Sequence, residues 1–167
     1  MATRTNERER LQPALLDRLL DDAPEQRQDR VDQRAISKPQ LRVAILRDLA
    51  SLFNAVRPNW IDMDAVPHVA SSVLNYGLPP MAGEVVSQLN VSTLEQAIKQ
   101  AIITFEPRIL PDSIVVRAVE ADDVLDTHNR ISINLSGRIW AQPIPLEFLI
   151  RTELDLETGQ MIVRDQS

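Results

Sequence analysis

The stretch RISINLSGRI, residues 130–139, alternates apolar and polar side chains along most of its length. Such alternation is typical of a strand with one buried and one exposed face. It recurs in LEFLIRTEL at residues 146–154, and a β-branched run, IVVRAVE, stands earlier at residues 114–120. After a turn at Glu157-Thr158-Gly159, a short apolar segment at residues 160–164 completes the series. The C-terminal half therefore predicts four strands that follow one another as an antiparallel meander.

Before these strands the apolar residues follow helical spacing. They recur every three or four positions between Pro39 and Pro58, which predicts a long helix with one buried face. A second helical stretch is predicted from about residue 65 to residue 75, and Gly77 with the prolines that follow it supplies the stop.

A further helix is predicted from the segment Ser92-Thr93-Leu94-Glu95, which has the spacing of a capping box. Apolar residues continue from it at helical intervals until Glu106 and Pro107 end the pattern. Helices that precede an antiparallel meander define the α+β class. The sequence therefore predicts N-terminal helices packed on a mostly antiparallel four-stranded sheet.

The N-terminal region is predicted to stand apart from this domain. Leucines between residues 11 and 19 form the stripe of a short amphipathic helix, and residues 24–38 are a mixed-charge segment with few apolar side chains. We divide the chain into a helix and polar linker at residues 1–38 and one α+β domain at residues 39–167. The helix is either an arm that docks on a partner or a part of its own domain.

Composition excludes several function classes. The 167 residues carry 18 Lys and Arg against 24 Asp and Glu, so nucleic acid is not an expected partner. Cysteine is absent, and the acidic residues before His128 do not match a calcium-loop pattern, so we expect no metal and no cofactor. The four glycines lie far apart, so no phosphate-binding loop is expected. Neither an export signal nor a membrane span is predicted, which favours a cytoplasmic protein.

One local motif stands out. In Phe105-Glu106-Pro107-Arg108 a helix runs directly into a proline flanked by opposite charges. Side chains two positions apart on a helix point away from each other, so we expect Glu106 and Arg108 not to satisfy one another. Pro107 rigidifies the segment and would lower the entropy lost on docking. We therefore assign Glu106, Pro107 and Arg108 to a partner-binding site.

The order of motifs resembles the baseplate wedge family of contractile injection machines, which includes the type VI secretion component TssE and its phage relatives. The segments that carry the resemblance are Leu15–Leu19, Ile45–Asn54, Ser72–Pro79 and Ile102–Arg108. The resemblance implies a fold like the interlocking domain of sheath proteins. It also implies a structural role in a cytoplasmic baseplate docked at the inner membrane, with other wedge subunits, the spike hub and sheath subunits as partners.

A sheath-like fold implies that an edge strand of the meander pairs with extended segments of sheath subunits. We assign this contact to the last strand, which is short and terminal, and name as its residues Gln160, Met161, Ile162, Val163 and Arg164. Proline at Ile162 is expected to remove an outward backbone donor with little effect on the interior.

Two other functions remain as alternatives. Members of the resembled family are often labelled lysozyme-like, and a peptidoglycan-cleaving enzyme needs two carboxylates with separated proton affinities. Glu106 lies beside a cation, and no second carboxylate stands out among Asp112, Glu120 and Glu147, so no catalytic residue is assigned. The second alternative is a plain homo-oligomeric domain that is not part of a machine. Neighbouring genes that encode sheath and spike proteins would argue against it.

Overall fold

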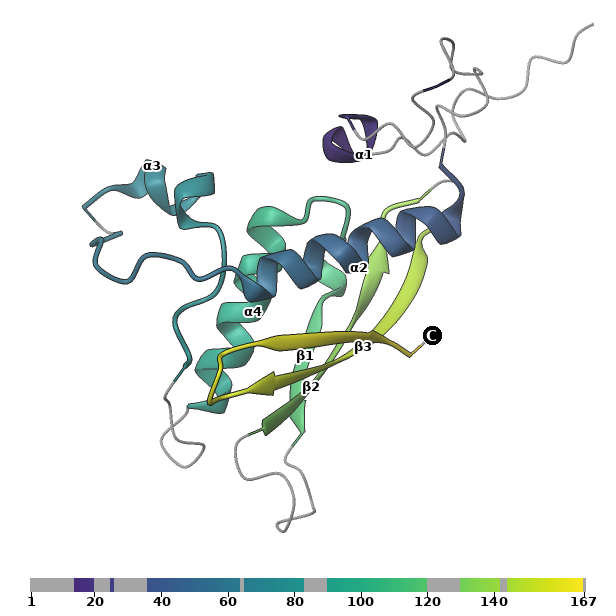
Figure 1. Cartoon of the computed structure of the whole chain (residues 1–167). Coiled ribbons are helices and arrows are strands. Elements are labelled where there is room, and N and C mark those ends of the chain that lie inside the picture. The colour runs from purple at the N-terminus through teal and green to yellow at the C-terminus, as the bar shows by residue number, and fades with distance from the viewer. Residues whose placement is uncertain are drawn as a thin grey trace, which may run out of the picture.

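A computed structural model gives the fold of the chain (Figure 1). It describes residues 14–19, 25, 36–63, 65–82, 90–119, 130–141 and 144–166. The helical elements are α1 (Leu15–Leu19), α2 (Lys38–Asn54), α3 (Pro67–Ala70), η3 (Val73–Asn75), α4 (Val91–Phe105) and η5 (Pro111–Ser113). The strands are β1 (Val115–Val119), β2 (Arg130–Ile139), β3 (Leu146–Asp155) and β4 (Met161–Asp165). The predicted helix start at residue 11 and most of the predicted linker lie outside the described residues.

The four strands form one antiparallel sheet in the order β1-β2-β3-β4. Leu135 at the centre of β2 pairs with Val116 on one side and with Ile150 on the other, and all three are buried. The side chains next to these in each strand point to the other face of the sheet; Arg151, which follows Ile150 in β3, is exposed to solvent. The predicted meander and the α+β class are therefore confirmed, because helices precede four strands that pair antiparallel in chain order.

Two helices cover the apolar face of the sheet (Figure 1). Helix α2 packs against β4 and α4 packs against β1, and the two helices also contact each other. The fully buried side chains at this interface include Ile45, Leu49, Leu52, Ile98, Ile102, Ile133, Leu135, Ile150 and Leu154. Burying each such side chain contributes about 1.5–3 kcal/mol, so this layer supplies most of the stability.

Helix α2 begins with a capping box that the sequence analysis did not identify. The Ser37 hydroxyl accepts from the backbone N–H of Gln40 at 3.4 Å, and the Gln40 side-chain oxygen accepts from the Ser37 N–H at 2.8 Å. Pro39 lies in the first turn, where its missing N–H costs nothing. The predicted long helix is confirmed, with its start one residue earlier than Pro39.

Helix α4 is confirmed, but its predicted N-cap is wrong. The cap is Asn90, whose side-chain oxygen accepts from the backbone N–H of Thr93 at 3.1 Å. Ser92 lies inside the first turn, and the Glu95 carboxylate accepts from the β1 residue Ala118 at 2.7 Å. Asparagine caps as well as serine does, so a cap at residue 90 lengthens the helix and frees Glu95 for the sheet.

The predicted helical stretch at residues 65–75 is interrupted. Its helical parts are the four residues of α3 and the three residues of η3, because the Ser72 hydroxyl accepts from the Leu74 N–H at 3.2 Å and starts a separate turn. These parts belong to a projecting loop, residues 57–77, which leaves the C-terminal end of α2 (Figure 1). The backbone of Leu78 closes its neck by bonding to Ala55 and Arg57, both at 2.9 Å.

Candidate functional site

Arg108 is the centre of an ion-pair cluster that joins the end of α4 to α2. Its Nε and Nη2 donate to the two carboxylate oxygens of Glu106 at 2.6 and 2.5 Å, and Nη2 also reaches Oδ2 of Asp48 at 2.5 Å. Its backbone N–H donates to Glu106 Oε1 at 3.2 Å. The Glu106 side chain is 4% exposed, whereas that of Arg108 is 22% exposed. A two-pronged arginine–carboxylate pair of this kind is among the strongest polar contacts in proteins.

The expectation that Glu106 and Arg108 do not satisfy one another is wrong. It assumed helical spacing, but α4 ends at Phe105 and the cap residue Glu106 has φ −121° and ψ 76°. The chain then turns at Pro107, so side chains two positions apart fold toward each other. The pair is a brace within the subunit. A contact of Glu106, Pro107 and Arg108 with another protein stays a prediction.

The cluster continues along α2 to the N-terminal helix. Arg47 donates to Oδ1 of Asp48 at 2.9 and 2.8 Å and to Oδ1 of Asp17, in α1, at 2.6 Å. These hydrogen bonds, the one to Asp17 first, raise the pKa of Arg47. Although burial acts to lower the pKa of Arg108, the hydrogen bond and charge of Glu106 and then those of Asp48 raise it overall. Both guanidinium groups therefore stay cationic, and alternating charges tie together α1, α2 and the end of α4.

Two aromatic rings border this cluster. Tyr76, at the end of the projecting loop, meets Phe105 edge to face with ring centroids 5.2 Å apart. Burial raises the pKa of the Tyr76 phenol, and the charges of Asp48 and Glu106 raise it further. The phenol therefore stays neutral, and the ring pair fixes one end of the loop against the end of α4.

Two buried polar atoms of the described residues lack a hydrogen-bond partner. They are Nη1 of Arg108 and Oδ1 of Asn75, although Asn75 Nδ2 donates to the Ala70 carbonyl at 2.9 Å. Such atoms are rare in folded proteins, and each calls for a physical explanation such as a bound water or a functional contact. The ion-pair cluster is therefore not fully satisfied by the described part of the subunit.

Strand β4 forms one edge of the sheet, so alternate backbone groups of β4 point away from β3. Met161 fixes the phase, because its N–H donates to Asn54 Oδ1 and its C=O accepts from Asn54 Nδ2, both at 2.9 Å. Val163, two residues later, turns its N–H and C=O outward, and no partner for them occurs among the described residues. The side-chain amide of Asn54 thus bonds the first outward N–H and C=O of this edge, as the backbone of a neighbouring strand would.

This phase overturns one expectation. The Gln160 carbonyl accepts from the Asp155 N–H at 2.9 Å, so Ile162, two residues further, directs its backbone groups toward Glu153 of β3. Proline at Ile162 would therefore break the ladder inside the sheet rather than remove an outward donor. The N–H of Val163, the next residue along β4, faces outward instead.

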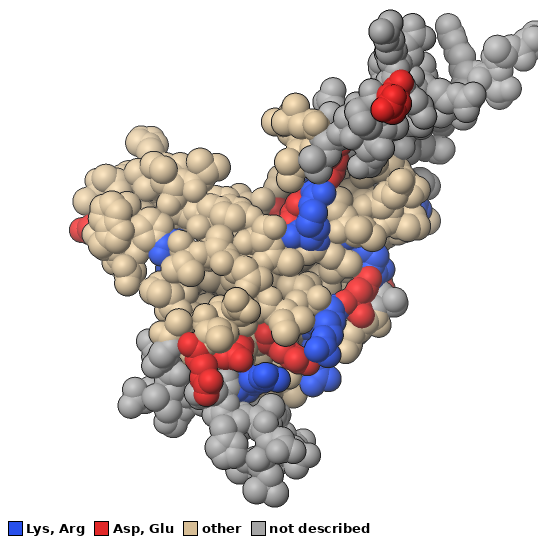
Figure 2. All heavy atoms as spheres, viewed as in Figure 1, with Lys and Arg blue, Asp and Glu red and all other residues tan. Residues whose placement is uncertain are grey.

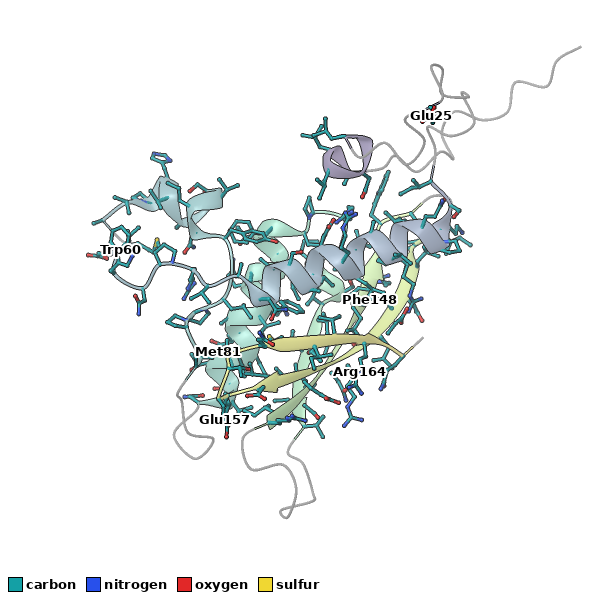
Figure 3. The ribbon with its side chains drawn as sticks, viewed as in Figure 1. Glu25, Trp60, Met81, Phe148, Glu157 and Arg164 are labelled. Carbon is teal, nitrogen blue, oxygen red and sulfur yellow. The ribbon has the colours of Figure 1, made fainter. Side chains whose placement is uncertain are left out.

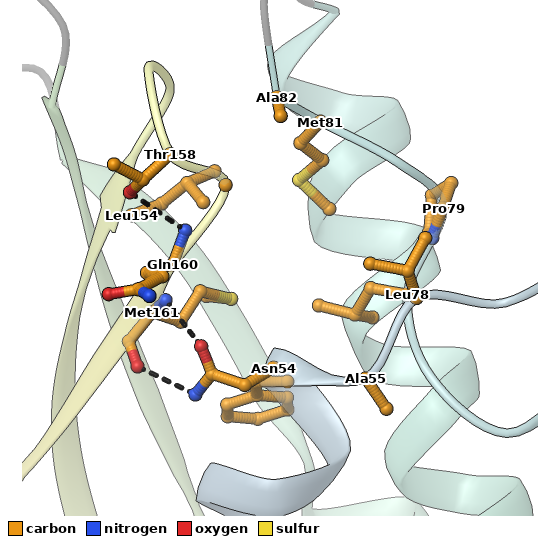
Figure 4. Close-up of a pocket in the computed structure, with 13 residues that line it drawn as sticks. Asn54, Ala55, Leu78, Pro79, Met81, Ala82, Leu154, Thr158, Gln160 and Met161 are labelled. Atoms are coloured by element: carbon orange, nitrogen blue, oxygen red, sulfur yellow. Dashed lines mark hydrogen bonds between the residues drawn. The ribbon is translucent and has the colours of Figure 1, made fainter.

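A cavity of about 250 Å³ lies beside the start of β4 (Figure 4). Its apolar wall includes Phe53, Leu78, Met81, Leu154 and Met161, and it separates the β3–β4 hairpin from the segment after the projecting loop. Cofactor pockets usually measure roughly 300–1,000 Å³. This cavity has the size of one or two side chains, which fits a contact with another protein better than a cofactor.

The opposite edge of the sheet is also occupied by a helix side chain. Glu95 of α4 accepts from the outward N–H of Ala118 in β1 at 2.7 Å. Sequence reasoning missed this role of Glu95 and the roles of Asn54 and Asp48. No local pattern reveals them, because each bonds to a residue 23 or more positions away.

No catalytic or metal-binding arrangement is found in the described parts of the chain. Glu106 is the one carboxylate that is buried there, and Arg108 donates to both of its oxygens, so it is not placed to act as an acid. Asp112 and Glu147 are exposed, while Glu120 lies outside the described residues. No three or more His, Cys, Asp or Glu are grouped to hold a metal ion in the same parts. Within them, too, no helix has the length and apolar character needed to cross a membrane.

A family model described as baseplate wedge protein gp25 matches residues 39–144, which is more than half of the chain. The matched region runs from α2 through β2 and contains the projecting loop and the ion-pair residues of α2 and Arg108. Strands β3 and β4 and helix α1 lie outside it. No curated protein and no solved structure matches the chain.

Proposed function

Since the chain belongs to the baseplate wedge protein gp25 family, we propose that it is a non-enzymatic structural subunit in the baseplate of a type VI secretion machine. In this role it joins the other wedge subunits to the spike hub and offers the first sheath ring a docking surface. The baseplate lies in the cytoplasm docked at the inner membrane, and the subunit neither binds nucleic acid nor inserts into the membrane directly. Family membership is the observation that carries the structural role.

The proposed sheath contact is the open edge of β4. It involves Gln160, Met161, Ile162, Val163 and Arg164, with Val163 supplying the outward N–H and C=O. A strand added here gains backbone hydrogen bonds, and the neighbouring apolar cavity can receive one of its side chains. The side chain of Asn54 already bonds the outward N–H and C=O of Met161, so the added strand pairs from Val163 onward or displaces the Asn54 amide.

Val163→Pro is expected to abolish sheath assembly in cells while leaving the purified subunit folded. The substitution removes an N–H that points outward from an edge strand, a position that tolerates proline. Val163→Ala is the matched control, because it shortens the same side chain but keeps the N–H, and sheath assembly should persist. Normal sheath assembly with Val163→Pro would show that this edge is not the docking surface.

The segment Glu106-Pro107-Arg108 is proposed to contact the wedge subunits beside the spike. Pro107 is exposed and Arg108 is partly exposed, so this turn offers a rigid surface whose charge is held by Glu106 and Asp48. The unpartnered Nη1 of Arg108 supports the proposal, because a contact that reorders the turn could complete its hydrogen bonding.

The division into an N-terminal helix and linker at residues 1–38 and one α+β domain at residues 39–167 stays a proposal, in which residues 1–36 form a docking arm. Leu15, Leu16 and Leu19 of α1 are all exposed, so these three leucines are not buried by the part of the subunit that the structure describes. Deleting residues 1–36 should leave a folded domain that enters the wedge complex less efficiently. Unchanged recovery of the truncated chain with purified wedge subunits would count against an arm.

The alternative of a peptidoglycan-cleaving enzyme is not favoured. Such an enzyme needs one carboxylate held protonated beside a second that stays ionised, and the buried Glu106 instead accepts from Arg108 through both oxygens. Purified protein should therefore release no soluble fragments from peptidoglycan. Release of fragments that disappears in Glu106→Gln would establish the enzymatic function. Self-association of the purified chain without binding to wedge subunits would instead support a simple homo-oligomer.

A further inference from the structure

The projecting loop, residues 57–77, exposes large apolar side chains and buries very little. Trp60 is 82% exposed, Val73 is 81% exposed and Leu74 is 65% exposed. Among the described residues of the loop only Asn75 and Gly77 are buried. Figure 3 shows Trp60 in the outer part of the loop, away from the sheet. A tryptophan exposed to this degree is unusual, because its ring is among the largest apolar surfaces a residue can bury.

The loop is nevertheless a specifically built element. Its neck is closed by the two backbone bonds of Leu78, and Gly77 adopts φ +115° with its α-carbon against the Ala55 backbone. Ordering a loop costs conformational entropy, which burial of apolar side chains normally offsets. In the described subunit the loop packs Tyr76 against Phe105 but leaves Trp60, Val73 and Leu74 exposed, so contact with another molecule would bury these three side chains.

The charge of the loop limits what that molecule can be. Residues 65–77 contain no Lys, Arg, Asp or Glu, whereas the first part of the loop carries Arg57, Asp62 and Asp64. Figure 2 shows few charged atoms on the projecting part of the surface. A charged partner face would lose its hydration here without gaining a counter-charge, whereas an uncharged apolar face would not. A lipid surface is less suited, because the loop has no cluster of basic side chains to attract anionic headgroups.

We propose that the 57–77 loop is a docking surface for an uncharged apolar face of another baseplate wedge subunit, with Trp60 as its anchor. This inference rests on the proposed function and adds a contact that is separate from β4 and from the Glu106-Pro107-Arg108 turn. Binding energy at protein interfaces concentrates in a few residues, among which tryptophan is enriched.

The test measures the affinity of the purified full chain for the purified wedge subunits of the same machine. Trp60→Ala should weaken binding by about 30-fold or more, as expected for an interface anchor. Leu74→Ala should weaken it by a smaller factor. Ile144→Ala is the matched control, since Ile144 is 68% exposed but lies outside the loop, and its affinity should equal that of the unmodified chain. All three variants should keep the melting temperature of the unmodified chain.

The outcomes separate this inference from the proposed function. If the unmodified chain binds the wedge subunits and Trp60→Ala binds equally well, the loop is not the docking surface while the structural role stands. If the unmodified chain binds none of them, both fail. The variant Trp140→Phe leaves Trp60 as the one tryptophan of the chain, so its fluorescence reports on the loop alone. A blue shift of its fluorescence on raising the protein concentration would assign the loop to a second copy of the chain. A blue shift on adding vesicles of phosphatidylethanolamine and phosphatidylglycerol would assign it to lipid. Either result would overturn the inference.

Discussion

Glu106→Ala is expected to lower the free energy of unfolding of the purified subunit by about 3–5 kcal/mol. The substitution removes a carboxylate that is 4% exposed and accepts from Nε, Nη2 and the backbone N–H of Arg108. Asp48 remains, but it bonds Arg108 through a single oxygen. The arginine is then left partly buried with too few acceptors, which is the costly way to break such a pair. Urea denaturation followed by circular dichroism measures the loss.

Two further variants sharpen this result. Glu106→Gln keeps an acceptor of the same shape, so it should lose less stability than Glu106→Ala. Arg164→Ala is a control on the surface, because Arg164 is 61% exposed and lies 3.6 Å from Glu153, and it should cost about 1 kcal/mol or less. Equal stability of Glu106→Ala and the unmodified protein would show that the cluster braces nothing. Glu106 would then have to act through partners alone, as the sequence first suggested.

Gly77→Ala is expected to cost about 3 kcal/mol or more and to open the neck of the projecting loop. Gly77 has φ +115°, a conformation that other residues rarely adopt, and an added Cβ would stand 2.3 Å from the Ala55 carbonyl oxygen. No flexible side chain can move aside there, because the two nearest atoms are the carbonyl oxygen and carbon of the Ala55 backbone. The bonds between Leu78 and its partners Ala55 and Arg57 should therefore weaken.

Hydrogen exchange of the Arg57 and Leu78 amides measures this opening directly. Both amides should exchange faster in Gly77→Ala, together with a lower midpoint of urea denaturation. Ser71→Ala, an exposed position in the same loop, should change the stability by less than about 0.5 kcal/mol. Unaltered protection of the Leu78 amide in Gly77→Ala would mean that the neck tolerates a side chain and is not the rigid base we describe.

The sheet and the long helices could be predicted because their signals are local and repetitive. Alternation over ten residues of β2 and ten of β3 fixes which face is buried, and a one-residue slip would invert it. The stripe of α2 works in the same way, since Ile45, Leu49 and Leu52 recur at helical spacing and all reach the core. The class and the order of the strands follow from these periods.

What the sequence could not reveal depends on contacts between distant residues or on single backbone conformations. Glu106 and Arg108 pair because one cap residue leaves helical geometry, a change that no periodicity records. The outward direction of Val163 is set by Asn54, more than a hundred residues away, because Asn54 bonds Met161. Likewise Glu95 fits a capping box by spacing, but Asn90 takes the cap and Glu95 bonds the sheet instead.

The central claim, a structural role in a contractile baseplate, is tested most directly by counting extended sheaths in cells that carry a fluorescent sheath subunit. Cells that lack this chain should form no extended sheaths, and the unmodified chain supplied in trans should restore them. Normal numbers of extended sheaths in cells without the chain would contradict the account.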